Sequence, residues 1–124
     1  MAEGFGREMI EELRRVEEVE IETRAAPGKP ARRRIIWVVV ANDEVYVRSV
    51  RGTAGRWYRD LLSHPTASLR VSGRDLAVRA VPVTDAATIA RVSAAYLSKY
   101  EASPHAPPIV REEVLSTTLR LEPA

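Results

Sequence analysis

The sequence contains no cysteine and only two histidines, and these absences exclude several kinds of functional site. Without cysteine there are no disulfide bonds and no thiolate ligands for a metal. His64 and His105 both stand beside proline in turn-like sequence, and two such residues do not make a metal site. A G-x-S-x-G nucleophile elbow, a P-loop and a G-x-G-x-x-G motif are missing as well. An enzyme built on this chain would therefore take its chemistry from a cofactor.

Long hydrophobic runs are also missing. The longest, IIWVVVA over residues 35–41, is too short to span a bilayer. The N-terminal text MAEGFGREMIEELRR lacks the apolar stretch of a secretory signal. We therefore expect a cytoplasmic protein with no membrane partner. Its 124 residues are the length of one domain and enough to bury a core without cross-links.

Lysine is scarce, since 17 of the 19 basic residues are arginine. A GC-rich genome would produce this bias without a functional cause, so position matters more than number. Residues 1–22 hold eight acidic and three basic residues, whereas residues 23–80 hold twelve basic and four acidic ones. The basic excess in the middle of the chain indicates a surface that could meet an anion.

Hydrophobic periodicity predicts a chain rich in strands. Alternation of apolar and acidic residues favours a strand over residues 19–23, and helical spacing favours an N-terminal helix within residues 1–17. The other expected elements are strands 33–41, 44–50, 68–72 and 76–83, helices 54–62 and 85–101, a helical turn near 109–114, and a closing strand over 115–122.

Six strands with two to three helices predict a closed barrel. An open six-stranded sheet would leave two unpaired edges and would need cover on at least one face, and closure solves both problems. We therefore expect a single mainly β (α+β) domain over residues 1–124. Its main strands lie in residues 18–83, and its helices pack outside an antiparallel barrel.

The text RGTAGRW is the strongest candidate for a binding site. Gly52, Thr53 and Gly55 stand directly before the expected helix 54–62, whose first N–H groups have no partner within the helix. Arg51 and Arg56 flank this loop, and a guanidinium group binds phosphate through two hydrogen bonds. The pattern fits a phosphate site. The alternative is a surface loop with solvated arginines and Thr53 as an ordinary N-cap.

A second basic cluster, GKPARRR, precedes strand 33–41. If this strand forms a hairpin with strand 44–50, the start of the first lies near the end of the second. Arg33 and Arg34 should then lie near Val50 and Arg51. We expect the two basic clusters to meet at one end of the barrel.

The aromatic residues are divided between core and surface by their neighbours. Trp57 and Tyr58 both have a leucine four residues further along, so at least one should be buried. Trp37, within RIIWVVV, is interpreted as barrel core. Tyr100, at the end of helix 85–101, is expected to be exposed enough to touch a ligand or partner.

Three segments resemble the deazaflavin-dependent nitroreductase branch of the pyridoxamine 5′-phosphate oxidase-like split barrels. They read IETRAAPGKPARR, RSVRGTAGRWYRDLLSHP and LRVSGRDLAVRAVPV, where that branch has texts similar to TTGRKSGKPR, WYHNLLANP and V-x-V-G-G-R. With VYVRSVRG and TTLRLEP, about nine tenths of the chain is still more similar to an uncharacterised bacterial domain family in the same superfamily. The resemblance implies a six-stranded split barrel, an FMN or deazaflavin cofactor, and a homodimer.

The resemblance also implies which residues hold the cofactor. Carried over by position, they are Lys29, Arg33, Arg34, Arg48, Ser49, Arg51, Gly52, Gly55, Arg56 and Trp57. This chain has Arg-Gly-Thr-Ala-Gly-Arg where the nitroreductases have a Lys-Gly-Gly text and His-Pro before Trp-Tyr, so the cofactor stays open between deazaflavin, FMN and none. No catalytic residue is assigned.

The function expected from sequence is therefore the binding of a phosphate-bearing flavin or deazaflavin in an oxidoreductase of unknown substrate. One alternative is a cofactor-free domain that binds a small anion or serves in assembly. Another is a nucleic-acid or polyanion binder, which is disfavoured because Trp37 and Trp57 lie in apolar runs rather than along exposed strands.

Overall fold

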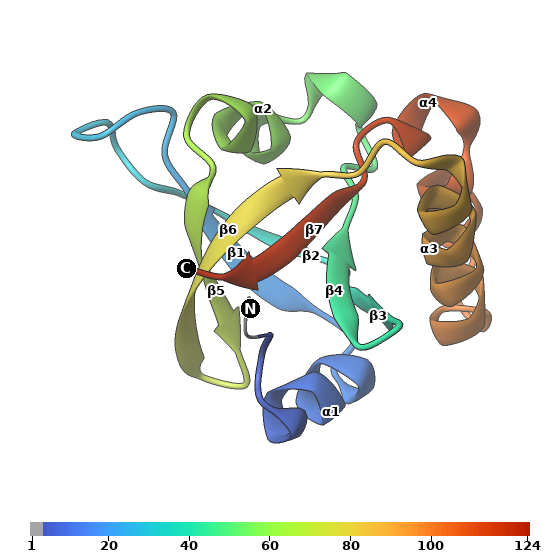
Figure 1. Ribbon diagram of the computed structural model, residues 1–124. Coiled ribbons are helices and arrows are strands. Elements are labelled where there is room, and N and C mark those ends of the chain that lie inside the picture. Colours follow the sequence, from blue (N-terminus) through green and yellow to red (C-terminus); the bar gives the residue numbers. More distant parts are fainter. Residues whose placement is uncertain (1–3) are drawn as a thin grey trace.

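A curled antiparallel sheet forms the body of the molecule, which a computed structural model describes for residues 4–124 (Figure 1). The sheet has seven strands in the order β2-β1-β5-β6-β7-β4-β3. Their bounds are β1 Val19–Thr23, β2 Arg32–Ile36, β3 Val39–Ala41, β4 Glu44–Val47, β5 Thr66–Val71, β6 Arg74–Pro82 and β7 Leu119–Pro123. The mainly β architecture is as expected, but the number of strands, six, is corrected to seven. The expected closed barrel is corrected to a curled half-barrel, because the edge strands β2 and β3 do not pair with each other.

The extra strand arises because the expected strand 33–41 is broken between Ile36 and Val39. β2 pairs with β1, and β3 pairs with β4 on the other edge of the sheet. The Val38 N–H donates to the Tyr100 hydroxyl at 3.2 Å, and the Val38 carbonyl accepts from Lys99 Nζ at 2.6 Å. Since side chains satisfy both backbone groups of Val38, no strand needs to pair there. The two edge strands, β2 and β3, are therefore consecutive in the chain and are joined by Trp37 and Val38.

Two tight hairpin turns in the sheet are identified by their backbone conformation. Asn42 and Asp43 between β3 and β4 have φ of 51° and 59°, and Ser72 and Gly73 between β5 and β6 have φ of 49° and 82°. Two successive positive φ values are typical of the two-residue turns that match the twist of antiparallel strands.

Four α-helices, α1 Arg7–Arg15, α2 Arg56–Ser63, α3 Ala86–Lys99 and α4 Glu112–Leu115, lie outside the sheet in the described residues. Two short 3-10 helices, η1 Gly52–Ala54 and η2 Pro107–Val110, precede α2 and α4. The expected two to three helices are corrected to four. β7 begins four residues later than predicted because the Thr117 and Thr118 N–H groups donate to Val114 and Leu115 carbonyls in a turn. No helix in residues 4–124 is long and apolar enough to cross a membrane.

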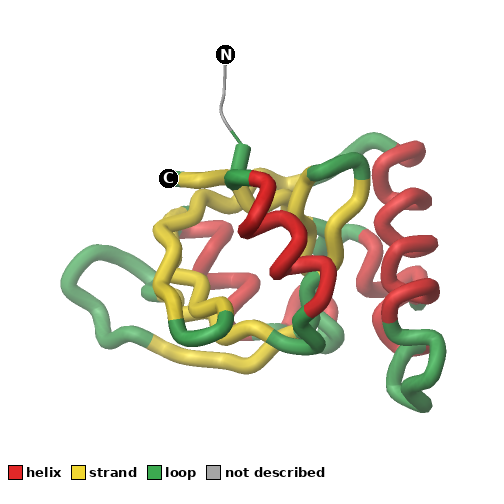
Figure 2. The backbone as a smooth tube through the Cα atoms, turned by 90° about the horizontal axis from the view of Figure 1, so that it is seen from below, coloured by secondary structure: helices red, strands yellow, loops and turns green. Residues whose placement is uncertain are grey.

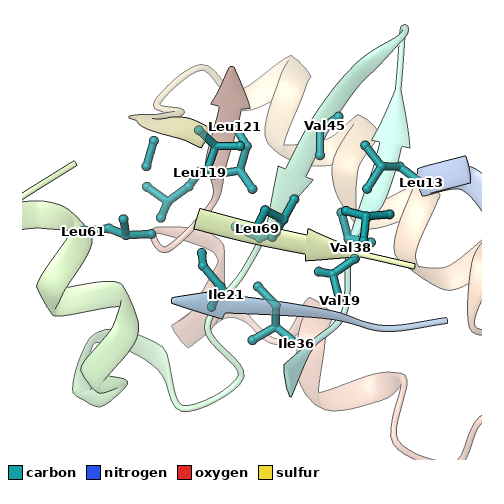
Figure 3. Packing of buried hydrophobic residues seen from close by; sticks show 14 of the residues in the cluster. Leu13, Val19, Ile21, Ile36, Val38, Val45, Leu61, Leu69, Leu119 and Leu121 are labelled. Carbon is teal, nitrogen blue, oxygen red and sulfur yellow. The ribbon is translucent and has the colours of Figure 1, made fainter. Parts of the chain in front are cut away.

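The main core fills the inside of the curled sheet (Figure 3). Ile21, Leu69 and Val78 are completely buried there. Leu13 on α1 and Leu61 on α2 belong to the same cluster. Seen from below, α1 crosses one end of the ring of strands, and α2 lies behind at the other (Figure 2). The ends of the barrel are therefore closed by helices, which also brings the start of α2 to one rim.

A second, smaller core lies between the sheet and α3. It includes Val39 and Tyr46 from the sheet, Tyr96 from α3, and Ile109 from η2. Val92 and Tyr96 are completely buried in it. This cluster attaches α3 and the following loop to the outside of β3 and β4 (Figure 1).

A candidate ligand pocket at the opening of the barrel

A pocket of about 580 Å³ opens where β2 separates from the chain that follows β4. This volume is within the range of about 300–1,000 Å³ typical of small-molecule sites. The lining residues come from the residue before β1, β2 and the residue after it, the segment after β4, the start of α2, and the loop between α3 and η2 together with η2 itself. They are Glu18, Arg32, Arg33, Arg34, Ile35, Ile36, Trp37, Arg48, Ser49, Val50, Arg51, Gly55, Arg56, Trp57, His105 and Ile109.

The opening follows from the pairing of β3 with β4. The last pair in their register is Val39 with Tyr46. Beyond it, Trp37 and Arg48 would face each other if the ladder continued, but β2 turns away to pair with β1. Residues from both diverging segments line the pocket. The predicted meeting of the two basic clusters is confirmed, although β2 itself does not pair with β4.

One side of the pocket carries an excess of positive charge. In residues 4–124, Arg34, Arg51 and Arg56 are exposed and have no salt bridge to a carboxylate. Arg32 Nε lies 3.5 Å from Asp60 Oδ2, and the nearest carboxylate to Arg33, that of Glu22, is 3.9 Å away. Glu18 is the only acidic residue among the described lining residues. This side attracts anions.

The N-terminus of α2 adds hydrogen-bond donors to the same side. The first intrahelical bond runs from the Arg59 N–H to the Gly55 carbonyl at 3.1 Å, so the N–H groups of Arg56, Trp57 and Tyr58 have no helical acceptor. No side chain caps this helix, and Thr53, the alternative N-cap, lies in η1 instead. Uncapped amides beside exposed arginines are suited to an anionic oxygen.

Ser49 provides a buried hydroxyl with no partner. Its side chain is only 1% exposed, and its Oγ makes no hydrogen bond within the described residues. A Cβ added to Gly55 would lie 2.2 Å from this oxygen. Gly55 therefore leaves space for the Ser49 hydroxyl against the start of α2, where both residues line the pocket.

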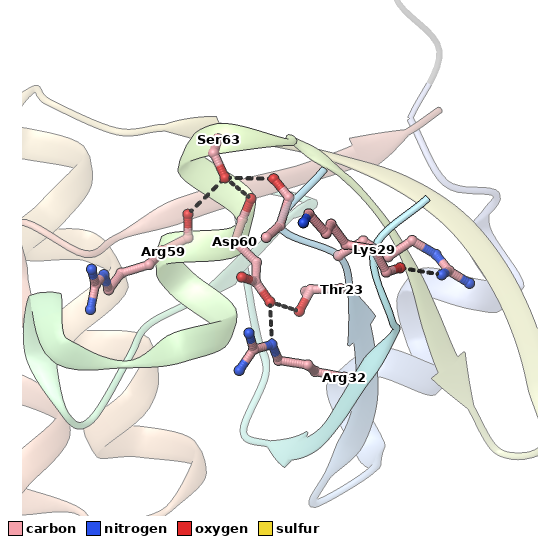
Figure 4. A network of polar contacts seen from close by, with 8 residues as sticks. Thr23, Lys29, Arg32, Arg59, Asp60 and Ser63 are labelled. Carbon is pink, nitrogen blue, oxygen red and sulfur yellow. Dashed lines mark hydrogen bonds and ion pairs between the residues drawn. The ribbon is translucent and has the colours of Figure 1, made fainter. Parts of the chain in front are cut away.

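A polar network fixes α2 against the β1–β2 hairpin (Figure 4). The Thr23 hydroxyl donates to the buried Asp60 carboxylate at 2.9 Å, and Arg32 approaches the same oxygen. The Ser63 hydroxyl donates to the Ala25 carbonyl at 2.9 Å. These contacts hold the far end of α2, and so orient its N-terminus toward the pocket.

The other side of the pocket is largely apolar and aromatic. Trp37 lines it and is stacked on Tyr100, with ring centroids 3.9 Å apart and an angle of 4° between planes. The interpretation of Trp37 as barrel core is wrong, because β2 ends at Ile36 and β3 begins only at Val39, so Trp37 lies outside the sheet. The expectation that Tyr100 is exposed is also wrong, since it is 4% exposed beneath Trp37. Burial raises the pKa of the Tyr100 hydroxyl to about 12.

Arg48 is buried at the base of this side. Only 2% of its surface is exposed, and its pKa is lowered because burial disfavours the charged form. Its guanidinium donates to the Thr118 hydroxyl, the Ser93 hydroxyl, and the carbonyls of Ile89 and Ile109, at 2.8 to 3.2 Å. Most of its donors are thus used within the protein.

The structure brings most of the sequence-predicted site residues together. The eight that line the pocket are Arg33, Arg34, Arg48, Ser49, Arg51, Gly55, Arg56 and Trp57. Lys29 lies in the β1–β2 loop, where its carbonyl accepts from Arg24. Gly52 is buried at a φ of 65°, below the Glu113 carbonyl. Neither lines the pocket, and we leave both out of the site proposed below.

Sequence reasoning missed several lining residues, of which Trp37, His105 and Ile109 matter most. His105 lies in a loop beside proline, which gives no sign of a binding role. No local pattern indicates that this loop reaches the pocket, since α3 carries it there from the other side of β4. The three arginines that begin β2 also include Arg32, which the resemblance does not select.

Solved structures share this fold at low sequence identity. They include HutZ, described as the heme storage protein from Vibrio cholerae (13% identity, TM-score 0.65, covering 98% of this chain and 92% of HutZ). An F420-H2 dependent reductase, FDR-A, also matches (17% identity, TM-score 0.65, 86% and 94%). A third is a NimC/NimA family protein from Clostridium acetobutylicum (11% identity, TM-score 0.62, 95% and 81%). A search of the curated proteins finds no match.

These neighbours share the split-barrel-like fold that the resemblance predicts. A family model matches residues 9–121, which is most of the sequence. The chain therefore belongs to the bacterial family described as "Uncharacterized protein conserved in bacteria (DUF2255)".

Proposed function

We propose that the pocket binds a phosphate-bearing flavin or deazaflavin. The observation that carries this proposal is that exposed arginines from β2 and from the loop before α2 converge on one pocket beside uncapped helix amides. The similarity in fold to an F420-H2 dependent reductase gives independent support. FMN and deazaflavin both combine an anionic phosphate with a flat ring, and the pocket has a side suited to each.

The phosphate is assigned to the cationic side. Arg51 and Arg56 provide guanidinium groups, and the first N–H groups of α2 point along the helix axis toward the same space. The Ser49 hydroxyl, which lacks a partner, is placed to donate to a ligand oxygen. A charge-assisted hydrogen bond contributes about 1.5–3 kcal/mol, so these groups together supply micromolar affinity, about 8 kcal/mol.

The ring is assigned to the apolar side. Trp37, Ile36 and Ile109 line this side, and Tyr100 supports Trp37 from behind. A flat ring against such a wall gains burial and stacking of aromatic faces. When bound, a flavin-type group supplies hydride chemistry, and the protein orients the ring and excludes water. The proposed activity is accordingly that of an oxidoreductase, with a substrate still to be identified.

The experiment is a titration of purified protein with FMN and with the deazaflavin F420, followed by ring fluorescence. We expect micromolar binding of at least one. The double variant Arg51→Ala/Arg56→Ala should bind it more than tenfold more weakly, which is about 1.4 kcal/mol. Arg59→Ala is the matched control, because Arg59 is exposed on α2 and does not line the pocket. Unchanged affinity in a folded double variant would refute the phosphate assignment.

Heme is a second candidate, and one observation favours it. His105 is exposed and lines the same pocket as the arginines. A histidine nitrogen is a common axial ligand of heme iron, and arginines suit the carboxylates of the propionates. HutZ, which shares the fold, is described as a heme storage protein. A Soret band on adding hemin that is lost in His105→Ala would support this alternative over a flavin.

We further propose that the protein forms a homodimer. Ile35 is 60% exposed and Val50 is 47% exposed, and both stand at the mouth of the pocket. β2 pairs on one side only, with β1. A second copy would cover this apolar rim and free edge. Light scattering should give twice the monomer mass, and Ile35→Asp should shift it toward the monomer.

A further inference from the structure

Arg48 connects four separate parts of the chain through one side chain. It follows β4, and its guanidinium reaches Thr118 before β7, Ser93 and Ile89 on α3, and Ile109 on η2. It also lies over the Tyr96 ring, with its central carbon 5.6 Å from the ring centroid. Such a set of contacts defines a position for α3 and η2 relative to the sheet.

The partners of Arg48 are all neutral. No carboxylate of residues 4–124 pairs with it, although it is almost fully buried. The fork geometry of a guanidinium, rather than its charge alone, is what satisfies hydroxyls and carbonyls in several directions. Lysine would carry the same charge but could not reach the four acceptors together.

These contacts matter for the pocket because they hold its apolar side. Ile109 lines the pocket, and its carbonyl accepts from Arg48 at 3.2 Å. His105, four residues earlier, belongs to the same loop, which is tied by bonds from Ala106 to Ser103 and from Ile109 to Ala106. The phosphate side depends instead on β2 and α2, which are held by Asp60, Thr23 and Ser63 (Figure 4).

We propose that Arg48 is a positioning residue for the ring side of the pocket rather than a ligand of the phosphate. It holds the segment from His105 to Ile109 in position against the sheet. Because this segment lines the pocket, its position determines the shape of the ring side. This inference rests on the proposed function for the identity of the ligand, but the role of Arg48 in placing the segment does not.

The test compares Arg48→Lys with wild type in two binding measurements, using FMN and inorganic phosphate as separate probes. A positioning role predicts that FMN affinity falls at least tenfold while phosphate affinity changes less than twofold. A direct phosphate contact predicts the reverse pattern, in which lysine retains FMN binding and Arg48→Ala loses phosphate and FMN together. Either that pattern or unchanged binding of both probes would overturn the proposal.

Ser93→Ala is the second variant, in case Arg48→Lys does not fold. It removes one acceptor of Arg48 on α3 and does not line the pocket. We expect a several-fold loss of FMN affinity with phosphate binding retained.

Amide hydrogen exchange separates this inference from the proposed function, because it needs no ligand. Exchange in residues 103–110 should be faster in Ser93→Ala or Arg48→Lys, while exchange in α2 stays the same. If wild type binds no flavin but the segment loosens, only the ligand assignment fails. If the segment keeps its wild-type exchange rate, the positioning role is wrong.

Discussion

Arg48 and Arg51 are three residues apart and occupy opposite kinds of environment. Arg48 is 2% exposed and its guanidinium is surrounded by neutral acceptors of the protein. Arg51 is exposed at the mouth of the pocket, with no salt bridge in the described chain. Arg48 connects α3, η2 and the turn before β7 to the sheet, whereas the guanidinium group of Arg51 is available to a ligand. A cluster of arginines in sequence is therefore not one functional unit.

The difference follows from where the strand ends. Val47 is the last residue of β4, and the next two residues, Arg48 and Ser49, are still buried. From Val50 the chain turns outward into η1 and α2, and the following arginines reach solvent. Burial and partners, rather than residue type, separate a structural arginine from a binding one.

The largest effect should come from removing the buried guanidinium. Arg48→Met leaves two hydroxyls and two carbonyls without their donor, and we expect a loss of about 3 kcal/mol in the free energy of unfolding. Arg51→Ala should change it by less than about 0.5 kcal/mol, because the side chain is exposed and unpaired. Urea unfolding of both variants measures the contrast. Equal losses would mean that the two arginines do not differ as described.

A smaller effect is expected at Gly55, on the binding side. Gly55→Ala places a methyl group 2.2 Å from the buried Ser49 Oγ, so the serine must move. We expect a loss of about 1–2 kcal/mol in the free energy of unfolding, as for other overpacked sites. Removing the hydroxyl in Ser49→Ala/Gly55→Ala should recover most of it, as a double-mutant cycle would measure. A double variant no more stable than Gly55→Ala would contradict the contact.

The smallest effect concerns Lys99, whose burial is intermediate between that of Arg48 and that of Arg51. It is half-buried, donates to the Leu13 and Val38 carbonyls, and its pKa is lowered to about 8 by burial. The unfolded chain then binds more protons than the folded protein between pH 8 and about 10.4, so stability should rise with pH through that window. Unfolding measured at pH 7.5 and 9.5 should show this rise in wild type, and less of it in Lys99→Met.

Local patterns were sufficient for the elements that hydrogen-bond to their neighbours in sequence. The β3–β4 and β5–β6 hairpins follow from turn residues, and α3 follows from its apolar spacing and from Asp85, whose side chain accepts from the Thr88 N–H. The meeting of Arg33 and Arg34 with Arg51 was also predictable, because β3 and β4 form a hairpin and carry their flanking residues to one end.

The features that the sequence did not predict depend on contacts between residues far apart in the chain. The break at Val38 depends on Tyr100 and Lys99, more than sixty residues away, which take its backbone groups. The burial of Arg48 depends on α3 and η2 in the same way. Because Trp37 and His105 reach the pocket only through these contacts, neither could be placed from its own surroundings.

The junction at Trp37 and Val38 has a consequence for the width of the pocket. It makes the two edge strands of the sheet successive pieces of one chain, and the pocket lies directly beside it. β2 is paired with β1, and β3 is paired with β4, so the separation of the two edges is limited by the two residues that join them. The covalent chain therefore sets an upper limit on how far this side of the sheet can open.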